Sequence, residues 1–178
     1  MSGIGAIIMA AFATVWWVVG VRGSGYAAPL TYGIPLVVAG LIVVAALRGR
    51  DRSERVPPEE RARRGRLVGI ASGVEGLAIF LAVNVLANVG RSDYAAPVIA
   101  IIVGLHFVPL ARWLPASLYY STAALLILLG VCGFAIQSSD RRLLVVSVGA
   151  ACVLWLTCII VLSRARIMRE RRSDAPAA

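Results

Sequence analysis

The sequence predicts an all-α protein, a bundle of six transmembrane helices arranged as three hairpins with both termini in the cytoplasm. Hydrophobic residues make up 60% of the 178 residues and charged residues only 15%, whereas soluble domains are about 25% charged. The mean hydropathy is +0.84. The apolar residues gather in long runs, and the arginines cluster between and after these runs, which is typical of membrane proteins and not of a nucleic-acid-binding face.

The apolar runs have the length of membrane helices, which need about 20 residues with a range near 17–25. There are six of them, at about 3–21, 27–47, 67–89, 97–113, 116–136 and 143–163. We predict helices because a backbone in lipid must satisfy its own hydrogen bonds, and the solid runs lack the alternation of barrel strands. Residues 1–163 are therefore predicted to form one six-span domain. No basic residue precedes Arg22, so the first run is expected to be a retained span and not a cleaved signal peptide.

Basic residues set the predicted orientation. The loop 48–66 holds eight of the eighteen arginines, and basic loops stay on the cytoplasmic side. With both termini inside, the tail 164–178 is also cytoplasmic, and the outer side keeps four arginines, Arg22, Arg91, Arg141 and Arg142. Loop and tail should attract anionic lipid headgroups at about 1 kcal/mol per arginine. Within the loop, two prolines ahead of Glu59 and Glu60 predict a break followed by a short helix.

An internal repeat suggests that a helical hairpin was duplicated. The tetrapeptide Tyr-Ala-Ala-Pro occurs at 26–29 and again at 94–97, each time after a turn containing glycine and arginine. Tyrosine suits the membrane interface, and proline is tolerated in the first turn of a helix. Both copies face the same way, unlike the inverted repeats of many secondary transporters.

Two ionisable residues lie inside apolar runs, where such residues are rare and often functional. Glu75 follows Leu67 by eight residues, about 12 Å of helix, and His106 precedes Trp113 by seven, about 10 Å. The two spans are consecutive and antiparallel, so both side chains should reach the same depth of the inner leaflet. We therefore predict a Glu75–His106 contact, either a structural clasp between helices or a site that handles protons or a ligand.

Other polar and small residues could extend this site. Candidates for a polar lining are Ser72, Asn84, Asn88, Tyr119 and Tyr120. Small residues form two stripes on the third span, one made of Ala71, Ala78 and Ala82 around Glu75 and the other of Gly69, Ser72, Gly73 and Gly76. Such faces let helices approach closely. Polar residues that simply join helices are the commoner case.

Enzymatic interpretations are weaker. One histidine and one buried acid do not make a multi-ligand metal site, no phosphate-binding glycine loop follows a strand, and we expect no cofactor. A serine nucleophile beside His106 is left open.

The run Gly104–Ala111, GLHFVPLA, is similar to one in small bacterial six-span membrane proteins of unassigned function. This resemblance implies residence in the bacterial inner membrane and implies no activity. The leading hypothesis is a small transporter, permease-like unit or channel that uses protonation of Glu75 and His106 as a switch, with assembly into a homo-oligomer. The alternative is a non-catalytic membrane scaffold or accessory subunit, and a lipid-modifying enzyme is a third class.

Overall fold

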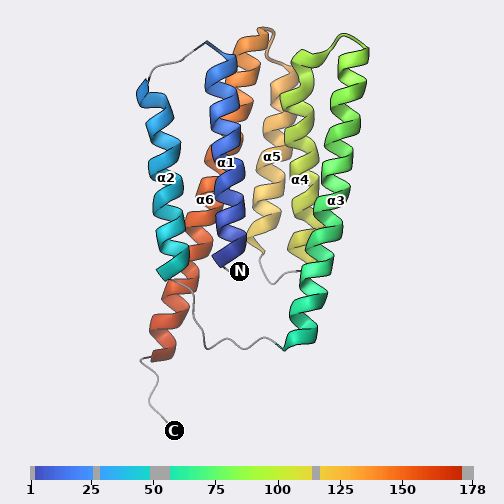
Figure 1. Ribbon diagram of the computed structural model, residues 1–178. Helices are drawn as coiled ribbons and strands as arrows, with labels where there is room; N and C mark the ends of the chain where they lie inside the picture. Colours follow the sequence, from blue (N-terminus) through green and yellow to red (C-terminus); the bar gives the residue numbers. More distant parts are fainter. Residues whose placement is uncertain (1–2, 26–28, 49–56, 114–116, 174–178) are drawn as a thin grey trace.

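The computed structural model describes residues 3–25, 29–48, 57–113 and 117–173, and it confirms an all-helical fold for this part of the chain. Each predicted apolar run corresponds to one long helix (Figure 1). The helices are α1 (Gly3–Gly23), α2 (Pro29–Arg48), α3 (Pro58–Asn88), α4 (Ala95–Trp113), α5 (Leu118–Phe134) and α6 (Ser139–Ser173), with a short 3-10 helix, η1 (Ser92–Tyr94), ahead of α4.

Length and composition make this a multi-pass membrane protein. Five of the helices are long and apolar enough to cross a membrane, and α5, with 17 residues, is apolar but shorter. At 1.5 Å per residue α5 reaches about 26 Å, slightly less than the hydrocarbon thickness of about 30 Å. A local thinning of the bilayer would accommodate that difference.

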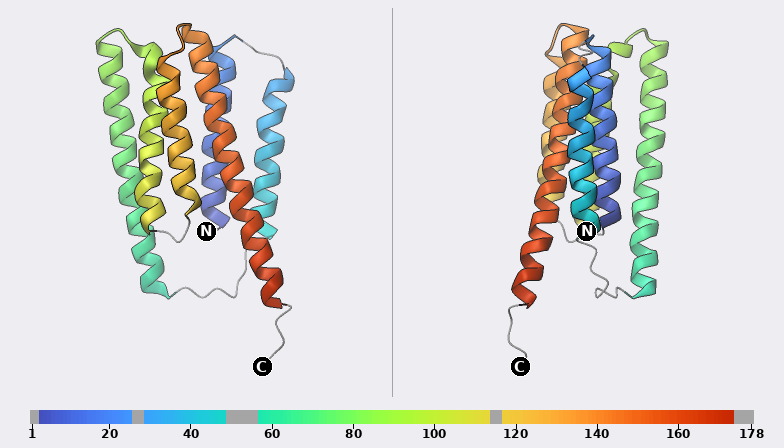
Figure 2. Two further views of the ribbon diagram at one scale, coloured as in Figure 1. Left: turned by 180° about the vertical axis from the view of Figure 1, so that it is seen from behind. Right: turned by 60° about the vertical axis from the view of Figure 1, so that its left-hand side comes forward.

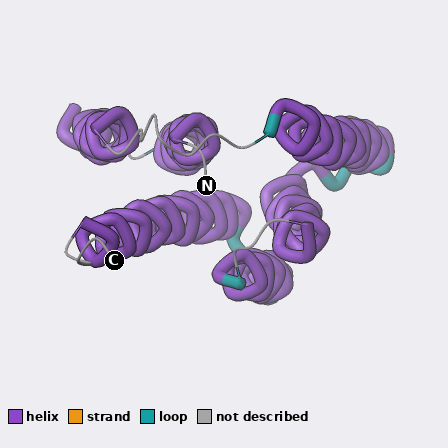
Figure 3. Tube along the Cα trace, turned by 90° about the horizontal axis from the view of Figure 1, so that it is seen from below, coloured by secondary structure: helices purple, strands orange, loops and turns teal. Residues whose placement is uncertain are grey.

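The helices form a central group with one helix at each flank. Helices α1, α4, α5 and α6 make the centre, where α4 packs most extensively on α5 and α1 on α6. Helix α2 packs on α1 and more lightly on α6, and α3 packs on α4 and η1 (Figures 2 and 3). Only a small part of α3 is buried, so most of its surface is available to lipid.

Small residues allow the close approach of the central helices. A Cβ atom on Gly104 would lie 2.7 Å from the Ile127 side chain, and one on Gly130 would lie 2.7 Å from the Pro97 carbonyl oxygen. A Cβ on Gly20 would lie 2.6 Å from Cβ of Ser147. Because real Cβ atoms are never this close to neighbours, glycine is needed at the α4–α5 and α1–α6 crossings. The buried core consists mostly of alanine, valine and aromatic residues from these helices.

Two helices are longer than predicted. Helix α3 already begins at Pro58, so residues 58–66 of the predicted basic loop belong to the same continuous helix as the third span, and the expected separate short helix is wrong. Helix α6 continues the sixth span to Ser173. Both helices extend past the lower ends of the others in Figure 1. The rest of the loop, 49–56, and residues 174–178 lie outside the described residues.

The turns after α1 and α3 share a backbone feature. Gly25 has φ +77° and Gly90 has φ +69°, a left-handed conformation that glycine adopts without a steric penalty. After α3, the N–H of Arg91 donates to the Leu86 carbonyl at 2.8 Å, which closes the helix end. Both glycines precede a Tyr-Ala-Ala-Pro copy. The first copy's residues 26–28 lie outside the described residues, and its Pro29 begins α2.

Candidate functional site: an intramembrane acid and histidine between α3 and α4

Glu75 lies on the face of α3 that contacts α4. Ala71, one turn earlier, is buried, while Ala78 and Ala82 on the same face are partly buried. The Glu75 side chain keeps 15% of its surface exposed. The alanine stripe predicted around Glu75 is thus the part of α3 that packs on α4, and its small side chains leave room for a ring from the opposing helix.

His106 projects from α4 toward one turn of α3. Its Nδ1 lies 3.3 Å from the Ala71 carbonyl oxygen and 3.5 Å from Oε2 of Glu75. A carbonyl oxygen can only accept, so Nδ1 must carry the proton and donate to Ala71. The carboxyl group lies just beyond ordinary hydrogen-bond length, within reach of an ion pair. The imidazole therefore contacts both the backbone and the acid of α3 through the same nitrogen.

Aromatic rings connect His106 to the interior of the bundle. The Phe107 ring packs edge-on against the imidazole with centroids 5.8 Å apart, and Tyr119 lies 5.5 Å from Phe107. Tyr119 is buried on α5. Deeper still, the hydroxyls of Thr122 and Thr157 share a hydrogen bond of 2.8 Å between α5 and α6. These hydroxyls are held by each other and by their own helices, which is the behaviour of interhelical polar joints.

Of the remaining residues of the predicted polar lining, Ser72 lies on the turn of α3 before Glu75, whereas Asn84 and Asn88 lie two or more turns after it. Ser72, Asn84, Asn88 and Tyr120 are exposed. The Asn84 amide donates to the Phe80 carbonyl of its own helix at 2.7 Å. The second predicted stripe is also uncovered: a Cβ on Gly69, Gly73 or Gly76 would have no neighbour within 4 Å.

Two hollows lie away from the pair. One open apolar depression lies on α2, around Gly33 and Val37, and a polar one lies near the start of α6, around Ser24 and Arg141. Within residues 3–25, 29–48, 57–113 and 117–173, no three His, Cys, Asp or Glu side chains come close enough to hold a metal ion. The three cysteines are free.

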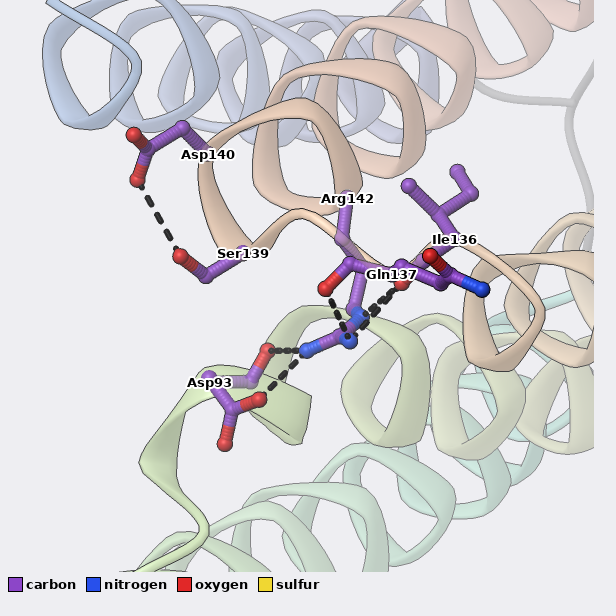
Figure 4. Close-up of polar contacts among 6 residues, drawn as sticks. All are labelled: Asp93, Ile136, Gln137, Ser139, Asp140 and Arg142. Carbon is purple, nitrogen blue, oxygen red and sulfur yellow. Dashed lines mark hydrogen bonds and ion pairs between the residues drawn. The ribbon is translucent and has the colours of Figure 1, made fainter.

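The end of the bundle that holds the α3–α4 and α5–α6 turns contains a polar cluster that the sequence did not reveal. Arg142, at the start of α6, is 2% exposed. Its guanidinium donates to the Ile136 carbonyl at 2.8 and 3.0 Å, to the Gln137 carbonyl, and to the backbone and carboxylate of Asp93 (Figure 4). The guanidinium also stacks 3.9 Å above the ring of Tyr94.

This cluster ties the α3–α4 turn to the α5–α6 turn. Each hydrogen-bonding nitrogen of Arg142 has a partner, and the Tyr94 ring in turn stacks on Phe134. In the predicted topology, Arg142 is one of only four arginines on the outer side, and Asp93 lies in another turn predicted on that side. These two placements were the only sequence signal for a contact between Arg142 and Asp93. The tyrosine of the second Tyr-Ala-Ala-Pro copy, Tyr94, therefore also stacks against a buried arginine, a role that the sequence analysis did not assign to it.

Comparison with known proteins gives a family without an assigned function. No curated protein matches the chain, and no solved structure matches it. Residues 59–164 match the model described as "Family of unknown function (DUF7010)". This segment covers more than half of the chain and contains Glu75, His106, Asp93 and Arg142. The chain belongs to the DUF7010 family.

Proposed function

We propose that this protein is a small transporter or permease-like unit of the bacterial cytoplasmic membrane, and that Glu75 and His106 bind the proton that controls it. The observation that carries the proposal is the 3.5 Å approach of Nδ1 of His106 to Oε2 of Glu75. Intramembrane ionisable groups are costly and mark transport pathways or relays by default. The family's lack of an assigned function and the apolar helices support an integral membrane protein; the transport role is our inference.

The position of the pair suggests how it would work. Among the described residues, the polar side-chain contacts of α3 with another helix are those with His106, and α3 packs mainly on α4. Protonation of the imidazole at Nε2 would give His106 a positive charge, form an ion pair with an ionised Glu75 and tighten α3 on α4. Interhelical polar contacts in membranes contribute about 0.6–2 kcal/mol. One to two kcal/mol changes a two-state ratio roughly 5- to 30-fold, enough to move a peripheral helix.

The predicted membrane setting is part of the proposal. Both termini lie in the cytoplasm, all six helices cross the bilayer, and the basic loop and tail contact anionic headgroups. Exposed arginines at one end of the bundle, such as Arg63, Arg66 and Arg164, support this orientation. Residence in the bacterial inner membrane is supported by the resemblance of the GLHFVPLA run.

Proton movement through proteoliposomes tests the proposal. We expect vesicles with an entrapped pH dye to show protein-dependent proton flux across an imposed gradient, and the flux to depend on pH. Glu75→Gln and His106→Ala should abolish this dependence while leaving the protein folded. Asn84→Leu, which removes a polar group from α3 without touching the pair, is the matched control. Wild-type flux equal to that of empty vesicles would rule out proton-driven transport.

The second candidate is a non-catalytic scaffold or accessory subunit in which the pair only holds α3 in place. It is favoured by the exposed positions of Asn84, Asn88 and Tyr120, which were predicted to extend the polar lining. In this case Glu75→Gln and His106→Ala should each lower thermal stability in detergent. Their effects should be non-additive, because removing either partner breaks the same contact. Unchanged stability in both variants would exclude this role.

The proposal also includes a homo-oligomer. It is supported by exposed glycines on the two flanking helices, since Gly33 and Gly40 on α2, like those on α3, have no neighbour at the Cβ position. Glycine faces of this kind suit close helix contacts in membranes. Native mass spectrometry from mild detergent should show more than one chain per particle, and a monomer at all detergent concentrations would contradict the prediction.

A further inference from the structure

The Glu75–His106 contact uses only part of the hydrogen-bonding capacity of the two side chains. Nδ1 of His106 is engaged by Ala71 and Glu75. Within the part of the chain that the structure describes, Nε2 of His106, Oε1 of Glu75 and the Ser72 hydroxyl have no hydrogen-bond partner. The pair is not sealed either, because the two side chains keep 11% and 15% of their surface exposed.

Ser72 and Glu75 lie beside one another on α3, next to an open part of its surface. Ser72 precedes Glu75 by three residues, and residues three apart are neighbours on a helix surface. Gly76 lies one turn after Ser72, and a Cβ there would meet nothing within 4 Å. The missing side chain leaves access from lipid to the acid at this level of α3.

The hydrogen-bonding character of these atoms indicates which class of ligand would bind. Because Nδ1 carries the proton, Nε2 of neutral His106 is an acceptor, and so is an ionised Glu75. Unpaired acceptors in hydrocarbon are costly, so the site favours a group that brings several N–H donors. A positive charge on that group also balances the carboxylate. A quaternary amine lacks donors, an alcohol supplies one donor and no charge, and an anion would be repelled.

We propose that Ser72, Glu75 and His106 form a site, entered sideways from the lipid, for the head of a lipophilic primary ammonium ion. Its N–H groups donate to Oε1 of Glu75, Nε2 of His106 and Oγ of Ser72, while its alkyl chain stays in the lipid beside the exposed glycines of α3. The inference deepens the proposed function and rests on it, because it names the class of molecule that the pair would carry.

The single histidine of the chain gives a direct readout. Full-length protein without a polyhistidine tag, labelled with ¹⁵N in the imidazole, is placed in lipid nanodiscs at about pH 8, where an alkylamine is protonated. Dodecylamine is titrated, and dodecyltrimethylammonium serves as a probe of equal charge without donors. We expect a saturable shift of the Nε2 resonance with dodecylamine only. Equal shifts with both amphiphiles, or none with dodecylamine, would overturn the proposal.

Variants separate the site from unspecific partitioning. Ser72→Ala should weaken dodecylamine binding about fivefold, the effect of one lost hydrogen bond, and Glu75→Gln should remove binding. The control, Ser121→Ala, changes an exposed serine on α5 and should bind like wild type. Ser72 is exposed, so its variant is expected to fold even if Glu75→Gln does not. If Ser72→Ala binds dodecylamine with unchanged affinity, Ser72 is not part of the site and the proposed three-residue site is wrong.

The two proposals can fail separately. Saturable, Glu75-dependent amine binding without proton flux would keep this site and reject transport. Glu75- and His106-dependent flux with no preference for dodecylamine over its trimethyl analogue would keep the proposed function and overturn the ligand class.

Discussion

At the scale of single residues, Arg142 is the buried charged side chain whose position is fixed by several hydrogen bonds. Removing a partner from a buried charge pair is costly because it leaves the other polar groups uncompensated. Here the partners are two carbonyl groups of the α5–α6 turn and Asp93 of the α3–α4 turn. The cluster therefore joins two loops that are far apart in sequence, and it should contribute to stability more than any exposed arginine does.

We predict that Arg142→Gln lowers the free energy of unfolding by about 3 kcal/mol, because a glutamine side chain cannot reach Asp93 and the Ile136 carbonyl together. Arg142→Lys should recover only part of this loss, since an ammonium lacks the planar fork of the guanidinium. Arg141→Gln is the control at the adjacent exposed position. Thermal unfolding in detergent measures all three, and equal stability of the Arg141 and Arg142 variants would contradict the structural role.

The sequence indicates how deep a residue lies along its helix more directly than which way its side chain faces. The helical rise alone put Glu75 and His106 at one level, and their side chains lie 3.5 Å apart. The angle around a helix axis depends on which neighbours pack against it, and for this reason Ser72 and Asn84, assigned to the same lining, are both exposed. Arg142 was missed because its partners are mostly backbone carbonyls of a turn, which leave no pattern in the sequence.

At the scale of elements, hydropathy located each helix but not its full length. The third run was expected at 67–89, and α3 starts nine residues earlier, at Pro58. Pro58 occupies the first turn, and Glu59 and Glu60 follow it there, all favourable at a helix N-terminus. No further proline lies before Leu67, and a single glycine, Gly65, is tolerated inside a helix. An apolar count detects only the part of a helix that lies in lipid, so the polar extension went unseen.

Glycine is needed where two helices cross closely, but at an open helix position it only lowers helix stability. Alanine substitutions at one site of each kind therefore make a matched pair. Gly104→Ala should destabilise the protein by about 1–3 kcal/mol, because its Cβ would meet the Ala123 carbonyl oxygen and the Ile127 backbone nitrogen, both at 3.0 Å. Gly73→Ala, at an open position of α3, should cost nothing and could gain up to about 1 kcal/mol. Unfolding by denaturant in detergent compares the two in the monomer, and a destabilised Gly73→Ala there would show that this face of α3 packs on something within the chain.

At the scale of the whole molecule, the chain order suggested three hairpins. Helix α1 contacts α2, α3 contacts α4 and α5 contacts α6, whereas α2 and α3 lie at opposite flanks of the bundle (Figure 1). The most extensive packing, however, crosses the predicted hairpins, between α4 and α5 and between α1 and α6. Small residues decide this: Gly104 and Gly130 bring α4 and α5 together, and Gly20 lets α1 approach Ser147. Sequence order limits which helices can be neighbours, but the shape of their surfaces decides how closely each pair packs.

The orientation of the bundle can be tested with three serines at its two ends. Ser92 and Ser138 lie in the turns that Arg142 joins, and Ser117 precedes α5 at the opposite end. All three are exposed. Each is changed to cysteine in a chain whose three native cysteines are replaced by alanine.

We expect a membrane-impermeant maleimide to label Ser92→Cys and Ser138→Cys in intact cells and Ser117→Cys only after permeabilisation. The reason is the arginine distribution: the Ser117 end carries the basic ends of α2, α3, α4 and α6, and positive segments remain in the cytoplasm. The opposite labelling pattern would show that the bundle has the reverse orientation in the membrane. It would then place Glu75 and His106 in the outer leaflet and reverse the direction in which the pair could take up a proton.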